Sequence, residues 1–231
     1  MDLRLLVNQY NRVLHKDNAS SYQGAYQTRD GAVQVNDRSA LVDMWTRDGR
    51  VFISSNPTIG TPETMSAAGT AYTLTAPSLR FTIPSGKLVV PIHVQLEVAT
   101  VIAKNDLFMV MVSDTDTFTS GGEAMAAARN AFVQSSKALR ATGVTNLLHS
   151  DTALVEAAVT STRTLKVLRR EGQAAELNTT WMPEYNILKG DPMVYIEGPA
   201  SFLVFAVQET TAAEAEWTIS WAELDINTVG S

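Results

Sequence analysis

The fold that this sequence predicts is decided by one stretch, LRFTIPSGKLVVPIHVQLEV at residues 79–98. Apolar and polar residues alternate along 79–83 and again along 92–98, with a Pro-Ser-Gly sequence at 84–86 between them. A period of two is typical of a β-strand with one face in a core, and glycine supplies the backbone angle of a tight turn. We therefore expect a β-hairpin with one buried face.

The same stretch contains two features that resemble binding motifs. A phosphate-binding loop needs glycine at position 81 and a hydroxyl residue at position 88, but Phe81 and Leu88 stand there. A cupin-like metal site needs a second histidine two residues after His93, and that residue is Gln95. The stretch therefore indicates structure and not chemistry, and we expect His93 to be solvated or at an interface.

Short runs of β-branched and aromatic residues, separated by Gly, Pro, Asn and Asp, continue along most of the chain. They predict strands, without the strand-then-helix alternation of a parallel sheet. The fold class is therefore all-β, mainly antiparallel, as a β-sandwich. One hairpin is expected around Asp48-Gly49. The predicted strands are 41–45, 51–54, 71–75, 79–83, 88–98, 106–112, 164–168, 193–197, 201–209 and 217–226.

The beginning of the chain departs from this strand pattern. Leu3, Leu6 and Tyr10 fall at helical spacing within residues 2–16, which predicts a short amphipathic helix. Its polar face is not basic, so docking on the body or on a neighbouring copy is favoured over a membrane surface. We expect residues 1–37 to form this helix and an extended arm, and these three side chains to be interface residues.

A second helix is expected inside the β region. Ser120 and Glu123 have the spacing of a capping box before an alanine-rich run, and Gly143 supplies a stop, which predicts a helix over 123–140. Phe132 would lie on its apolar face, which suits packing across a sheet edge or in a groove between subunits. We therefore expect 38–231 to be a single domain with a helical insertion at about 120–162.

Composition excludes several classes of function. The chain has 231 residues, 45% of them hydrophobic, which is enough for one sizeable core. Its net charge of −6 argues against direct binding to nucleic acid, and the lack of cysteine excludes disulfides and thiolate chemistry. No stretch approaches the ~20 apolar residues of a membrane span, and the first residues do not form a signal peptide.

The strongest chemical feature is Asp114-Thr115-Asp116, directly after an apolar strand. Two carboxylates at a strand end could hold a divalent metal and a diphosphate, as in a glycosyltransferase-like enzyme. Such enzymes need a nucleotide-binding α/β half, which this sequence does not predict. Aspartates that cap turns are the favoured interpretation. A weak Ca²⁺ site formed by Asp114, Asp116 and Glu123 stays open, and no other cofactor is expected.

Other catalytic motifs are missing from the sequence. It contains no G-x-S-x-G, no G-x-G-x-x-G and no H-E-x-x-H, so we expect no catalytic residues and no enzyme. Trp217, Ile219 and Trp221 share one face of the last predicted strand. An aromatic ladder in the core is favoured there, and a sugar-stacking platform of a carbohydrate- or receptor-binding module is the alternative.

The pattern resembles a known family in two places. FTIPSGKLVVPI at 81–92 precedes a long alternating strand. Near the end of the chain, a Gly198-Pro199 turn, the apolar strand 201–209, an Ala/Thr-rich loop and the strand 217–226 follow one another. Both resemble strands of small viral coat proteins with a single jelly roll. The likeness covers residues 40–110 and 160–228 and depends on strand pattern and order.

This resemblance implies a jelly-roll sandwich that acts as a structural subunit of a virus or phage capsid, located in the virion. The expected partners are further copies of the chain and, in a shared shell, other coat proteins. Many such proteins carry a basic N-terminal arm that neutralises the genome. Residues 1–30 hold four basic residues and three acidic ones. We therefore expect no strong binding of nucleic acid by the arm.

Overall fold

The computed structural model describes residues 26–27, 33–34, 38–66, 73–99, 105–132, 141–150, 153–157, 161–171, 181–208 and 213–226. The chain forms two compact units, Met1–Asp43 and Met44–Ser231. In the first unit, β1 (Tyr26–Gln27) pairs antiparallel with β2 (Val33–Gln34). The predicted helix at 2–16, with Leu3, Leu6 and Tyr10, lies outside the described residues.

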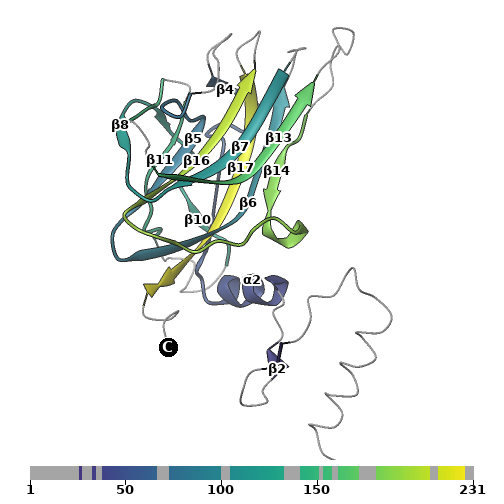
Figure 1. Cartoon of the computed structure of the whole chain (residues 1–231), viewed down its shortest axis with the longest axis vertical. Helices are drawn as coiled ribbons and strands as arrows, with labels where there is room; N and C mark the ends of the chain where they lie inside the picture. Colours follow the sequence, from purple (N-terminus) through teal and green to yellow (C-terminus); the bar gives the residue numbers. More distant parts are fainter. Residues whose placement is uncertain are drawn as a thin grey trace, which may run out of the picture. The chain divides into compact units, whose positions relative to one another are not determined.

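The second unit is built from two antiparallel sheets, which we name sheet I and sheet II (Figure 1). Sheet I has the order β10-β3-β17-β6-β14, with β15 also paired to β6 and β4 to β17. Its strands are β3 (Val51–Ser55), β4 (Glu63–Ser66), β6 (Lys87–Ala99), β10 (Arg129–Asn130), β14 (Glu184–Asn186), β15 (Ile196–Glu197) and β17 (Ala213–Asp225). The short helix η2 (Ile187–Lys189) follows β14.

Sheet II has the order β13-β7-β16-β5-β11-β9. Its strands are β5 (Leu79–Ile83), β7 (Asn105–Ser113), β9 (Glu123–Ala124), β11 (Thr145–His149), β13 (Thr162–Glu171) and β16 (Ala200–Gln208). A separate short ladder joins β8 (Phe118–Ser120) to β12 (Val155–Glu156). All strand pairs in the described part of this unit are antiparallel, so the all-β antiparallel prediction is confirmed. Within the described ranges, no helix has the length and apolar character needed to cross a membrane.

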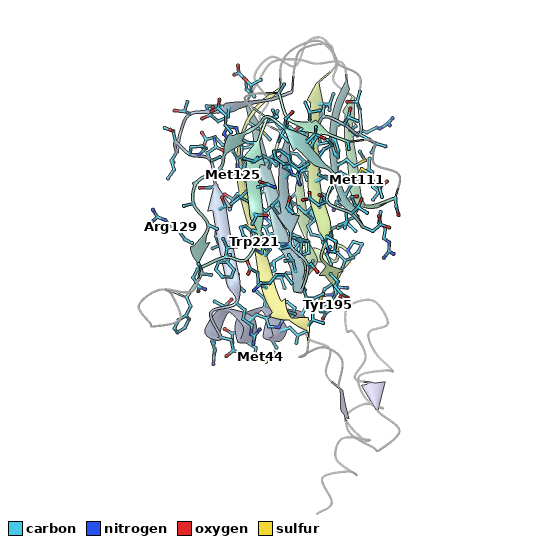
Figure 2. All side chains as sticks on the ribbon, turned by 90° about the vertical axis from the view of Figure 1, so that its left-hand side faces the viewer. Met44, Met111, Met125, Arg129, Tyr195 and Trp221 are labelled. Atoms are coloured by element: carbon cyan, nitrogen blue, oxygen red, sulfur yellow. The ribbon has the colours of Figure 1, made fainter. Side chains whose placement is uncertain are left out.

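Aromatic side chains from both sheets form the centre of the core. Phe81 of sheet II stacks on Phe202 at 4.9 Å between ring centroids and lies 5.2 Å from Trp221 of sheet I. Trp221 is fully buried, and Figure 2 shows it inside the sandwich, whereas Arg129 projects outward. Trp217 and Ile219 are buried on the same face of β17. The predicted aromatic ladder in the core is therefore confirmed.

The hairpin predicted at 79–98 is wrong, although both of its strands form. Strand β5 pairs with β16 and β11 in sheet II, whereas β6 pairs with β17, β14 and β15 in sheet I. Gly86 does turn the chain, with φ +78°, and Lys87 N donates to Pro84 O at 3.2 Å. The turn thus carries the chain from sheet II to sheet I. The alternation of apolar and polar residues predicts both strands but does not specify whether they pair with each other.

The predicted strand at 41–45 is also wrong, because these residues belong to helix α2 (Arg38–Arg47). Gly49 has φ +66° and donates to Thr46 O, while Arg50 N donates to Trp45 O. These two bonds form a Schellman motif, the usual end of a helix at a left-handed glycine. The Asp-Gly pair therefore ends a helix here instead of joining two strands.

The described part of the helix predicted over 123–140 is not helical. Residues 123–124 form β9 against β11, and residues 129–130 form β10 against β3. Both glycines before this segment have left-handed backbone angles, and a Cβ on Gly121 would lie 1.9 Å from Ala153 O. These two glycines therefore let an extended chain pass close to a neighbouring segment, and they do not cap a helix. Phe132 is half-buried beyond β10, and 133–140 lie outside the described residues.

Two further predicted strands fail in part. In the segment 71–75, the described residues Thr73–Thr75 form a turn, in which Ala76 N donates to Thr73 O. In the segment 193–197, only Ile196–Glu197 pairs, as β15. The predicted strands at 51–54, 88–98, 106–112, 164–168 and 201–209 are confirmed with small changes of their bounds. The last prediction, 217–226, starts four residues late and ends one residue late, because β17 spans Ala213–Asp225.

Candidate functional site

The described part of the chain has one concentrated group of buried charges, and it lies on the side of sheet II that faces away from sheet I. Phe81 of β5 points toward Trp221 of sheet I, so its neighbours Arg80 and Thr82 point the other way. Both are nevertheless buried, and Arg80 has no exposed surface at all. The prediction that β5 has a solvent-facing side is therefore wrong, because other chain segments cover that side.

The guanidinium of Arg80 contacts two carboxylates. Its Nη1 lies 2.9 Å from Glu156 Oε1, and its Nη2 donates to Asp116 Oδ1 at 3.0 Å. The contact with Glu156 is an ion pair only, because Arg80 Nη1 and Glu156 Oε1 are close but are not aligned for a hydrogen bond. Arg80 Nη2 also donates to Thr82 Oγ1 at 2.6 Å and Ser201 Oγ at 3.2 Å. We name Arg80, Asp116, Glu156, Thr82 and Ser201 the Arg80 cluster.

The carboxylates come from the two segments that form the β8–β12 ladder. Thr117 Oγ1 donates to Glu156 Oε2 at 2.6 Å, and Ala157 N donates to Thr117 O at 2.8 Å. The ring of Phe118 covers the guanidinium, with Arg80 Cζ 4.6 Å from the ring centroid, a cation–π contact. The Arg80 cluster therefore fastens two loop segments onto the outer side of sheet II.

The two carboxyl groups differ in their pKa. Burial raises the pKa of Asp116, but hydrogen bonds from Arg80, Phe118 N and Thr82 together hold it below its ordinary value. Burial also raises the pKa of Glu156, and there the bond from Thr117 and the charge of Arg80 do not compensate, so this pKa stays above its ordinary value. Two carboxyl groups therefore share one guanidinium, and Glu156 is the one whose ionised form is disfavoured by burial.

The chemistry open to this cluster is limited by access. The side chains of Arg80 and Glu156 are both completely buried, so no substrate could touch them without movement of the covering segments. Buried ion pairs of this kind cost desolvation energy and chiefly fix geometry. We conclude that the cluster positions the 114–118 and 154–157 segments and does not form an open catalytic site.

Another buried carboxylate lies in sheet I, at a position that no motif in the sequence marks. Glu223 accepts hydrogen bonds from Trp221 Nε1 at 3.1 Å, Thr142 Oγ1 at 2.5 Å and Gly143 N at 2.7 Å. These bonds satisfy the buried carboxylate and hold the chain that leads into β11. Like the Arg80 cluster, Glu223 joins segments that are far apart in sequence.

The residues proposed for a Ca²⁺ site do not lie together as a set. Asp116 is engaged by Arg80, Asp114 is exposed and accepts from Ser161 Oγ at 2.5 Å, and Glu123 is exposed on β9. Among the residues that the structure describes, no three His, Asp or Glu side chains form a group that could hold a metal. Calcium binding by these three residues stays a prediction.

His93 pairs with a carboxylate of its own chain. Its Nε2 lies 3.6 Å from Glu184 Oε2 on β14, and Glu184 also accepts from Lys189 Nζ at 2.6 Å. Burial lowers the pKa of His93 more than Glu184 raises it. His93 is half-buried on the outer face of sheet I, as expected from the alternation along β6.

Comparison with known proteins adds no family to this description. No protein-family model matches the sequence, and a search of curated proteins finds no relative.

Proposed function

We propose that this chain is a structural subunit of a virus or phage capsid, that its sandwich is a jelly roll, and that it self-assembles into a shell. The proposal treats the chain as a building unit and not as an enzyme. Its surfaces, and not an internal pocket, would then perform its function.

The observation that carries the proposal is the order in which strands pair. Eight strands (β3, β5, β6, β7, β13, β14, β16 and β17) form nested pairs: β3 with β17, β5 with β16, β6 with β14, and β7 with β13. The first strand thus pairs with the last, the second with the seventh, and so on inward. A long antiparallel ribbon folded in this way into two sheets of four supports a jelly roll, an architecture that capsid and lectin domains share.

The site supports a structural role over the alternatives. Trp217 and Trp221 are 3% and 0% exposed, so they offer no platform on which a sugar could stack. Asp116, the central residue of the transferase hypothesis, is held by Arg80. The buried charges thus stabilise loops, which is what a subunit with defined contact surfaces requires.

The test is the mass and shape of the purified full chain, measured by light scattering and negative-stain electron microscopy over a range of salt and pH. We expect closed oligomers or shells. A chain that stays monomeric at high concentration under all these conditions would contradict the proposal.

A variant pair tests the proposed N-terminal contact. Leu6→Asp places a charge on the apolar side of the predicted helix at 2–16, and Asn8→Asp places the same charge on its polar side. We expect Leu6→Asp to weaken assembly and Asn8→Asp to leave it unchanged. Equal behaviour of the two variants would remove Leu3, Leu6 and Tyr10 from the contact.

A further inference from the structure

The outer face of sheet I carries an unfavourable arrangement of charges. Glu97 of β6 lies directly opposite Glu216 of β17 in the ladder, and Glu214 follows on the same face. Like charges directly opposite each other destabilise a sheet. Gly60 N donates to Glu216 Oε2 at 3.3 Å, and the adjacent Ile59 is 89% exposed. We name Glu97, Glu214, Glu216 and Ile59 the acidic ridge.

The opposite charge is gathered on strand β13, whose sequence TRTLKVLRRE contains four basic residues in a chain of net charge −6. Arg163 and Arg169 are exposed, and Val167 between them is 47% exposed. Lys166 is bound to Asp191 at 2.6 Å. In the register with β7, Val167 and Arg169 lie on one face of β13 and Arg163 lies on the other, because a bulge stands between them. The edge strand therefore presents basic side chains on both of its faces, and we name Arg163, Val167 and Arg169 the basic edge.

The position of β13 makes the basic edge accessible. It is the last strand of sheet II in the described part of the chain, where it pairs with β7 (Figure 1). Basic side chains on an edge strand oppose its pairing with an identical edge. Two copies of β13 would place arginine against arginine, so the basic edge favours a different surface as its partner.

We propose that the basic edge of one copy docks on the acidic ridge of the next copy. This inference rests on the proposed function and names the contact that would join the subunits. Each surface combines an exposed apolar side chain, Val167 or Ile59, with charged neighbours, as interfaces do. The charges are complementary, and the contact relieves the repulsion between Glu97 and Glu216.

The proposed contact joins two different surfaces, so it repeats head to tail. Contacts of this heterologous type form rings when the rotation between copies closes and open filaments when it does not. A subunit of a shell needs at least one such repeating contact. Because its charges are exposed, the contact weakens as salt screens them.

The experiment exchanges the two charges. One full-length variant carries Arg163→Glu and Arg169→Glu, and the other carries Glu97→Lys and Glu216→Lys. The controls are Arg129→Glu and Glu123→Lys, which each make one charge reversal of the same kind on an exposed residue of β10 or β9. Light scattering gives the concentration at which each protein assembles, alone and in a one-to-one mixture of the two exchanged variants, at low and high salt. Thermal unfolding verifies that each variant is folded.

We expect each exchanged variant alone to need at least about tenfold more protein to assemble, and the mixture to recover most of that loss. Both controls should assemble like the unchanged chain. If the unchanged chain assembles and the exchanged variants assemble equally well, the contact is wrong while the proposed function stands. If only the β13 variant is impaired and mixing restores nothing, the basic edge serves another acidic partner and the proposal is overturned. An unchanged chain that never assembles overturns both.

Discussion

The two sheets differ in how they use their outer faces. On sheet II that face is buried, with an apolar cluster of Met109, Met111, Leu203 and Phe205, against which Leu74 packs, and with the Arg80 cluster beside it. On sheet I it is open: Ile53 is 40% exposed, and Thr218 is exposed. An antiparallel sheet can present one face to water. Sheet I does so, which leaves its outer face free for contacts, whereas the middle strands of sheet II are covered by segments of their own chain and its edge strand β13 is exposed.

The largest effect should come from the layer between the sheets. Phe81→Ala removes the ring that joins Phe202 to Trp221, and a cavity of this kind should lower the free energy of unfolding by about 4 kcal/mol. Denaturant unfolding measures the change. Ile53→Ala, on the open face of sheet I, is the control and should cost less than about 1 kcal/mol. Equal losses would show that the outer face of sheet I is also packed.

The next largest effect should come from the covered face of sheet II. Arg80→Met leaves Glu156 buried without its cation, which should cost about 3 kcal/mol in unfolding free energy. The double variant Arg80→Met with Glu156→Gln should recover part of this loss, because no unpaired charge is then left. A single variant as stable as the unchanged chain would mean that water reaches the cluster.

Asp116→Asn should have a smaller effect, about 1 kcal/mol, because the Asp116 side chain is 37% exposed and water screens its pairing with Arg80. The pKa of Asp116 is lowered in the fold, so its contribution is present above its ordinary pKa of 3.8 and is lost as the pH falls through the folded value. Denaturant unfolding of both proteins at pH 7 and in acid measures the stability difference and its pH dependence. A difference between the two proteins that grows in acid would contradict this sign.

The smallest effect should come from Glu156→Gln at neutral pH, where we expect stability equal to that of the unchanged chain or slightly higher. Burial raises the pKa of Glu156, so its ionised form is disfavoured in the fold. The unchanged chain should gain stability relative to the variant as the pH falls through the raised pKa toward the ordinary value of 4.5. Thermal unfolding across this window measures the difference. A marked loss at pH 7 would show that the ion pair outweighs desolvation.

The alternation of residues predicted most strands but not their partners. Strands β6 and β17 were clear because one face of each is apolar over many residues. The same alternation in β5 suggested a solvent-facing side at Arg80, because a single strand contains no information about a segment that covers it. Likewise, Asp48-Gly49 is compatible with a hairpin turn and with a helix end. The helix forms here, and it buries Trp45.

The sequence predicted only one member of the Arg80 cluster as a candidate site residue. The sequence drew attention to Asp116 as one of two carboxylates after a strand, but its partner Arg80 lies 36 positions away. Glu156 lies in a stretch without a recognisable motif. Glu223 lies in a strand that was interpreted from its tryptophans. No spacing rule joins such residues, since the nested pairing of the strands brings them together.

The nested pairing also determines how the sandwich responds to force. Strands β3 and β17 are antiparallel neighbours, and Val51, the first residue of β3, lies opposite Ala222, near the end of β17. Tension applied where the chain enters β3 and leaves β17 would therefore load the hydrogen bonds of this ladder one after another and not all at once. Under load, the subunit should unzip from this corner while the ladders between β5, β16 and β7 still hold.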